Sequence, residues 1–239
     1  ADTTGIQNIA LGTNALTKVT GGANNIAIGN LALCGNVSGT FQVAIGVEAL
    51  KGGTGSHNIA IGCAAGAVTT GAGNIAIGSA ARIAATAGTC NIAIGQKAQG
   101  GITTGAALCN IAMGMCAMYG NASTSGNDNI ALGKCSMFAA TTGVCNIALG
   151  VNALTAITTG DDNIAIGCFA GQSVTTTDNT INIGCGANQT TTSVACIVAV
   201  CLMSACFFET SDCRSKCKIK DLPYGLNFIN LLRPVSYKW

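Results

Sequence analysis

The cysteines are the residues of this sequence whose type and spacing could support covalent chemistry. The chain of 239 residues contains 14 cysteines. Three pairs occupy equivalent positions in consecutive repeats: Cys90 with Cys109, Cys116 with Cys135, and Cys168 with Cys185. Equivalent residues in stacked strands lie about 4.8 Å apart, which suits a disulfide. The spacing therefore predicts ladder disulfides, while the alternative, which we prefer, is that each cysteine is a small buried hydrophobe.

Metal chemistry is not indicated by the same residues. The sequence has no Cys-x-x-Cys pattern and only one histidine, whereas a structural zinc site needs four closely placed Cys or His ligands. His57 lies between Ser56 and Asn58 at the entry to a repeat, and we interpret it as a turn residue without a catalytic role. We expect no metal and no cofactor.

A recurring pentapeptide, typified by Asn-Ile-Ala-Ile-Gly, organises most of the chain. Its copies are residues 8–12, 25–29, 42–46, 58–62, 74–78, 91–95, 110–114, 129–133, 146–150 and 163–167, with a degraded copy at 180–184. The closing glycines follow one another at intervals of 16 to 19 residues. Helix pairs and propeller blades need roughly 34 to 50 residues per unit. The short period therefore predicts an all-β fold, a parallel β-solenoid of about eleven coils.

Each repeat contains the pattern of a short strand. Side chains alternate along a strand, so Ile9 and Leu11 point to one face and Ala10 to the other. We expect the bulky face to form the core and the small face to allow close approach of a neighbour. Gly12 permits the positive φ of a corner. A second alanine-containing segment and a Thr/Gly-rich turn follow, which predicts two strands and two turns per coil.

The composition excludes several classes of protein. Hydrophobic residues make up 49% and charged residues 8% of the chain, whereas an ordinary soluble domain has about 25% charged residues. Disorder is excluded because it requires low hydrophobicity and high net charge. The net charge of +2 attracts no phosphate backbone, so we expect no nucleic-acid partner. Recurrent threonine pairs could suggest an ice-binding array, but their uneven spacing in turns argues against one.

Membrane insertion is also not expected. The longest apolar stretch, 195–208, is shorter than the roughly 20 residues of a spanning helix. The chain begins at Ala1 without the pattern of a secretory signal, so we expect a processed form or a fragment.

The apolar surplus predicts self-association. A coil this small encloses little volume, and a rod that presents the same stripe at every level suits symmetric assembly. We expect the partner to be the chain itself, in a homo-oligomer and specifically a homotrimer. The alternative is a monomeric solenoid with an apolar surface.

The repeats resemble the head repeats of YadA-type trimeric autotransporter adhesins. The shared pattern is Asn-Ile-Ala-Ile-Gly followed by two variable residues and then alanine, over about residues 5–187. The same repeat occurs in phage tail fibres and in fibre proteins of large eukaryotic viruses. The resemblance implies a trimeric left-handed parallel β-roll, which we expect over domain 1–187, and a role as an extended surface fibre.

The end of the chain resembles the start of an endosialidase-type intramolecular chaperone domain. The matching runs are 211–216, 221–230 and 232–239. The resemblance implies a nucleophilic Ser211 assisted by Lys216, with cleavage between Thr210 and Ser211. A serine needs a base, and nearby cations can lower a lysine pKa enough to supply one. The alternative is a solvated basic linker over 211–220 that leads into a helix at 224–232.

Three domains and three functions follow as expectations. The chaperone-like segment, residues 211–239, is expected to be a short α+β segment. Residues 188–210, between it and the solenoid, are interpreted as a neck or as one more irregular coil. The first hypothesis is a fibre protein on the surface of a virus or phage particle, extracellular, contacting other virion components and a host-surface receptor or glycan. The second is a bacterial adhesin head. The third is a single-turnover autoprotease at Ser211; otherwise we expect no enzyme.

Overall fold

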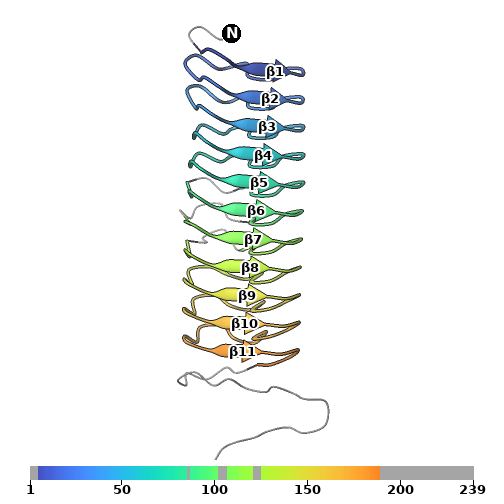
Figure 1. The fold of residues 1–239 in the computed structure, drawn as a ribbon, viewed down its shortest axis with the longest axis vertical. Coiled ribbons are helices and arrows are strands. Elements are labelled where there is room, and N and C mark those ends of the chain that lie inside the picture. Colours follow the sequence, from blue (N-terminus) through green and yellow to red (C-terminus); the bar gives the residue numbers. More distant parts are fainter. Residues whose placement is uncertain (1–4, 85–86, 102–106, 121–124, 189–239) are drawn as a thin grey trace, which may run out of the picture.

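The computed structural model describes residues 5–84, 87–101, 107–120 and 125–188. They form an all-β solenoid in which each coil contributes one short strand (Figure 1). The strands are β1 (Ile9–Leu11), β2 (Ile26–Ile28), β3 (Val43–Ile45), β4 (Ile59–Ile61), β5 (Ile75–Ile77), β6 (Ile92–Ile94), β7 (Ile111–Met113), β8 (Ile130–Leu132), β9 (Ile147–Leu149), β10 (Ile164–Ile166) and β11 (Ile181–Ile183). The predicted parallel β-solenoid is thereby confirmed.

The strands form one parallel sheet in chain order. In this 11-stranded sheet each strand pairs with the strand that follows it in the chain, from β1 to β11. The register is the one that the repeat predicts, since Ile59 pairs with Ile75 and Ala60 with Ala76. Figure 1 shows the result as a straight stack of coils with the strands aligned on one side.

The closing glycine of each repeat makes the corner after the strand. Gly95, for example, has φ +128, and a Cβ built there would lie 2.7 Å from the carbonyl carbon and oxygen of Gly114 in the next coil. Only a residue without Cβ allows the backbones of adjacent corners to approach this closely. The glycine column therefore sets both the turn and the coil spacing.

The second strand expected in each coil is not present in the described residues. The segment after the corner is a turn in which left-handed residues alternate, such as Asn14 (φ 59) and Leu16 (φ 53). Its backbone still bonds between coils, as in Leu16 N to Ala32 O at 3.1 Å. Left-handed conformations break the extended geometry of a strand, so the prediction of two strands per coil is wrong.

The strands also face the opposite way from the sequence expectation. The central alanines Ala27, Ala44 and Ala60 are completely buried inside the coil, whereas Ile59 and Ile61 on either side of Ala60 are exposed. Leucines of the opposite wall, such as Leu33 and others in its column, share one buried cluster with these alanines. The leucine side chains fill the narrow interior of the coil, so only the methyl group of an alanine fits opposite them. The aliphatic residues of the strands therefore point outward, and the expected bulky inner face is wrong.

A buried asparagine column supports the strand side of the coil. The backbone amide of Asn91 donates to Oδ1 of Asn74, and that of Asn110 donates to Oδ1 of Asn91, each at 3.0 Å. Nδ2 of Asn91 donates to the carbonyl oxygen of Ala107 at 2.8 Å. Each asparagine thus joins two coils and a turn, which explains why the repeat begins with this residue. The recurrence of asparagine at this position was the signal in the sequence from which this role could have been predicted.

Gln42 interrupts this column and offers a test of its importance. Gln42 is fully buried, yet neither its Nε2 nor its Oε1 has a hydrogen-bond partner. The extra methylene displaces the amide from the asparagine register. We expect Gln42→Asn to raise the free energy of unfolding by about 1–3 kcal/mol, the usual cost of an unpaired buried polar group, measured by urea unfolding. Asn146→Gln is the reverse control and should be destabilising. A Gln42→Asn variant no more stable than the parent would contradict the ladder interpretation.

The predicted neck at 188–210 lies outside the described residues except for Asn188, and so does the whole segment 211–239. Among the residues that the structure describes, no helix has the length and apolar character needed to cross a membrane.

Candidate functional site

The outward residues of the stacked strands form a continuous surface on the described part of the chain, which we call the outer strip. It consists of the first and third residues of each strand from β1 to β11. All of these positions hold isoleucine, leucine, valine or methionine: Ile9, Leu11, Ile26, Ile28, Val43, Ile45, Ile59, Ile61, Ile75, Ile77, Ile92, Ile94, Ile111, Met113, Ile130, Leu132, Ile147, Leu149, Ile164, Ile166, Ile181 and Ile183. The strip contains no charged or polar side chain.

The outer strip is partly accessible to solvent in the single chain, because its residues are either exposed or half-buried. Ile61 is 37% exposed and Ile166 42% exposed. Val47, Met115 and Val151, each directly after a corner glycine, are also exposed and widen the apolar surface. Single exposed apolar residues are ordinary, but a continuous apolar patch marks an interaction surface.

Side chains at equivalent positions of successive coils contact each other on the outside of the solenoid. Phe41 and His57, which both precede the first residue of a repeat, stack with ring centroids 5.1 Å apart. Tyr119 and Phe138, both five residues after a corner glycine, stack at 5.5 Å. His57 therefore has a packing partner, which sequence reasoning had missed.

The cysteines lie on these outer columns rather than in the core. All nine cysteines in the described ranges are free thiols, and each is exposed or half-buried in the single chain. The expectation of small buried hydrophobes is therefore wrong for these residues. They point outward because the coil interior is already filled by the alanine and leucine columns. The ladder disulfides stay a prediction.

Cys90 and Cys109 interact electrostatically across adjacent coils. They occupy the same column as Phe41 and His57, and both have left-handed backbones, with φ 57 and 55. The pKa of Cys109 is raised, chiefly by partial removal of the thiol from water and further by Cys90 and Asp128. Since the thiolate is the nucleophile in disulfide exchange, this shift slows the reaction of Cys109 at neutral pH.

We expect oxidised glutathione to join Cys90 to Cys109, and to do so faster as the pH rises toward the raised pKa of Cys109. In the overall exchange, the two protein thiols lose two electrons and two protons, and oxidised glutathione is reduced to two molecules of glutathione. Peptide mass spectrometry after alkylation measures the pair. Cys90→Ser is the control, because it should leave Cys109 alkylatable. Persistent free thiols at both positions at alkaline pH would rule out a disulfide between Cys90 and Cys109.

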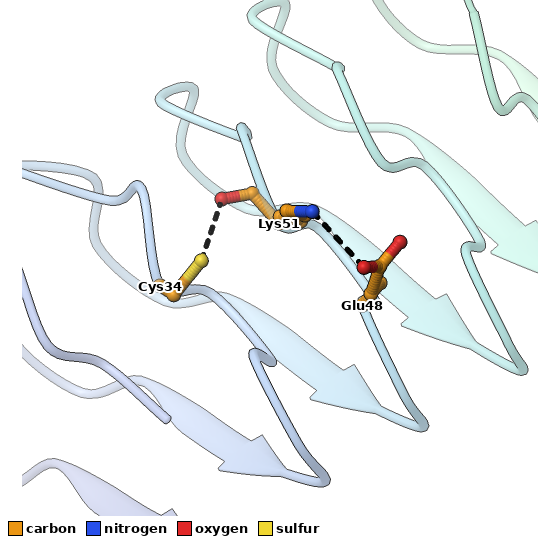
Figure 2. A network of polar contacts seen from close by, with 3 residues as sticks. All are labelled: Cys34, Glu48 and Lys51. Atoms are coloured by element: carbon orange, nitrogen blue, oxygen red, sulfur yellow. Dashed lines mark hydrogen bonds and ion pairs between the residues drawn. The ribbon is translucent and has the colours of Figure 1, made fainter. Parts of the chain in front are cut away.

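A small polar network joins two coils near Cys34. The thiol of Cys34 donates to the carbonyl oxygen of Lys51 at 3.6 Å, and Nζ of Lys51 lies 3.0 Å from Oε1 of Glu48 (Figure 2). Glu48 raises the pKa of Lys51 through a hydrogen bond and by its charge. Exposed pairs of this kind contribute little to stability, and the network does not bring a base to an activated nucleophile.

The remaining predicted site residues are not placed. Ser211 and Lys216 lie outside the described residues. Within the described ranges, no group of three or more His, Cys, Asp or Glu side chains could hold a metal ion.

Comparison with known proteins identifies no relative. No family model, curated protein or solved structure matches the chain. The class of protein is therefore defined by the fold alone, a parallel β-solenoid with one apolar outer strip.

Proposed function

We propose that this chain assembles with identical copies along the outer strip, as a homotrimer. The observation that carries the proposal is the strip itself, in which the outward strand positions are all aliphatic or methionine. Eleven strands at about 4.8 Å spacing and a width of roughly 10 Å give a flat area on the order of 500 Å². This is at the upper end of the apolar patches that monomers expose.

A second copy suits the strip better than an unrelated partner. Each level repeats the same two aliphatic positions, and the parallel register keeps them aligned over the full stack. An identical chain alongside therefore presents a matching row at every level, so all rows are covered by one symmetric arrangement. The number three, and the left-handed winding, rest on the resemblance to YadA-type head repeats.

The mass of the assembly in solution tests this proposal. One chain has a mass of 23.6 kDa, and a trimer should therefore give about 71 kDa by light scattering coupled to size exclusion. A stable species of 23.6 kDa at micromolar concentration would contradict self-association, and a dimer would contradict the trimer alone.

For the trimer we propose a structural role as the shaft or head of a fibre on the surface of a virus or phage particle. A thin, straight stack of short coils extends far for its mass, and its outer columns are free to contact a receptor or glycan (Figure 1). Immunogold labelling of intact particles tests this role. Labelling of surface projections is the expected result, and particles labelled only after disruption would contradict it.

An adhesin head is the second candidate, because the outer strip suits a trimeric adhesin equally well. The chaperone-like resemblance of residues 211–239 favours the viral fibre. Heptad repeats encoded directly downstream would favour the adhesin.

Self-cleavage at Ser211 is a separate proposal that rests on the chaperone resemblance. Intact mass of the product of the complete gene tests it. Cleavage between Thr210 and Ser211 should occur in the parent and be lost in Ser211→Ala, and identical fragments in both would exclude the Ser211 and Lys216 pair.

A further inference from the structure

Arg82 is a charged residue in the interior of the solenoid. It lies four residues after the corner Gly78, in a column that most other coils fill with large apolar side chains, although Gly66, Gly171 and Asn188 also occupy it. The large apolar residues are Leu16, Leu33, Leu50, Met118, Met137 and Leu154. Arg82 is only 1% exposed, and Gln99, at the same position of the next coil, is completely buried. Two successive coils therefore place polar side chains where six other coils have a buried leucine or methionine.

The contacts of this pair leave donors without acceptors. Nε of Arg82 donates to Oε1 of Gln99 at 3.2 Å, and Nη2 donates to the carbonyl oxygen of Gly88 at 3.3 Å. Nη1 of Arg82 and Nε2 of Gln99 are buried and have no hydrogen-bond partner. Unpaired buried donors are rare in folded proteins and are costly, so these two atoms indicate a missing acceptor.

The guanidinium charge is also uncompensated by the protein. The sequence contains no aspartate or glutamate between Glu48 and Asp128, so the coils around Arg82 supply no carboxylate. Burial lowers the pKa of Arg82 to about 10, which still leaves the group protonated at neutral pH. An unpaired buried cation is strongly destabilising unless a negative group approaches it.

We propose that the solenoid binds a small monovalent anion of the chloride type inside the coil, at Nη1 of Arg82 and Nε2 of Gln99. The acceptor must be negative because the guanidinium is charged, and small because the site is enclosed. Gly88 packs closely against the other nitrogen, since a Cβ added there would lie 2.8 Å from Nη2. With Arg82 only 1% exposed, we expect a small ion to suit this interior better than a phosphate or carboxylate ligand. A carboxylate from another copy is excluded as well, because Arg82 is shielded from the surface.

Thermal unfolding of the full chain in sodium chloride and in sodium gluconate at equal ionic strength tests the site. Gluconate is too large to enter, and equal ionic strength keeps charge screening constant. A ligand that binds the folded state alone raises the melting temperature with its concentration. We expect chloride to raise it by roughly 3 °C or more relative to gluconate.

Variants distinguish the interior site from general salt effects. Arg82→Leu combined with Gln99→Leu restores the apolar column and should abolish the difference between the two salts. Lys134→Gln removes an exposed cation and should keep it. Equal melting temperatures of the parent in both salts, or a chloride effect that persists in the double variant, would overturn the proposal.

Crystals grown in bromide provide a readout that does not depend on the variants folding. An anomalous peak within hydrogen-bonding distance of Arg82 Nη1 is expected. An ordered water at that position, without anomalous signal, would also overturn the proposal.

Discussion

Gly95→Val should lower the free energy of unfolding by at least about 3 kcal/mol, because it combines backbone strain with a steric clash. Gly95 has φ +128, a conformation that residues with a side chain rarely adopt, and its Cβ would lie 2.7 Å from backbone atoms of Gly114. Backbone atoms cannot rotate away as a flexible side chain can, so the adjacent coils must separate. Urea unfolding followed by far-ultraviolet circular dichroism measures the loss.

Gly73→Val is the matched control for this prediction. Gly73 also has a positive φ, +69, but the nearest atom to its Cβ would be Sγ of Cys90 at 3.7 Å. The variant should therefore show only the cost of the left-handed conformation, about 1–2 kcal/mol. Equal losses at the two positions would mean that close stacking of the corners does not limit the coil spacing.

Ile61→Asp should dissociate the proposed trimer while each chain keeps its fold. Ile61 lies on the outer strip and is 37% exposed, whereas its neighbour Ala60 is fully buried. Complete burial of an aliphatic side chain contributes about 1.5–3 kcal/mol, so burial of the exposed third of Ile61 contributes about 0.5–1 kcal/mol in each of the three copies. Loss of this burial alone should therefore lower the association constant by at least about 10-fold, and desolvation of three carboxylates adds to the loss.

Light scattering coupled to size exclusion measures this effect as a shift from about 71 kDa toward the 23.6 kDa of one chain. Val68→Asp is the control, because Val68 is similarly exposed, at 42%, but lies outside the strands. It should leave the mass unchanged. The outer strip would be excluded as the interface if Ile61→Asp kept the trimer mass, or if Val68→Asp disrupted it as fully.

The strand positions were predictable because the repeat encodes local geometry. The pentapeptide 58–62 contains β4, Ile59–Ile61, and its final glycine is the corner. The in-register pairing of Ala60 with Ala76 also follows from equal spacing. The second strand of each coil was wrongly predicted, because residues such as Leu16 adopt left-handed conformations. An aliphatic side chain gives no indication of such a conformation in the sequence.

The candidate site was predictable only in outline. The apolar surplus indicated a partner, but the cysteines were expected in the core and lie on the outer columns instead. Arg82 and Gln99 were not singled out, because their burial depends on a position within the coil that is apolar in most other repeats. The signal available in the sequence was the replacement of leucine or methionine at that position.

By itself, the sequence determined the period, the one strand within each pentapeptide, its parallel register and the glycine corners, since the same local pattern recurs in every repeat. Only the tertiary structure decided which face of each strand points inward. Alternation defines two faces but does not distinguish inside from outside, because the choice depends on the space left by the opposite wall. There the leucine column, represented by Leu33 and Leu50, fills the coil. Alanine therefore faces inward, and the isoleucines point outward.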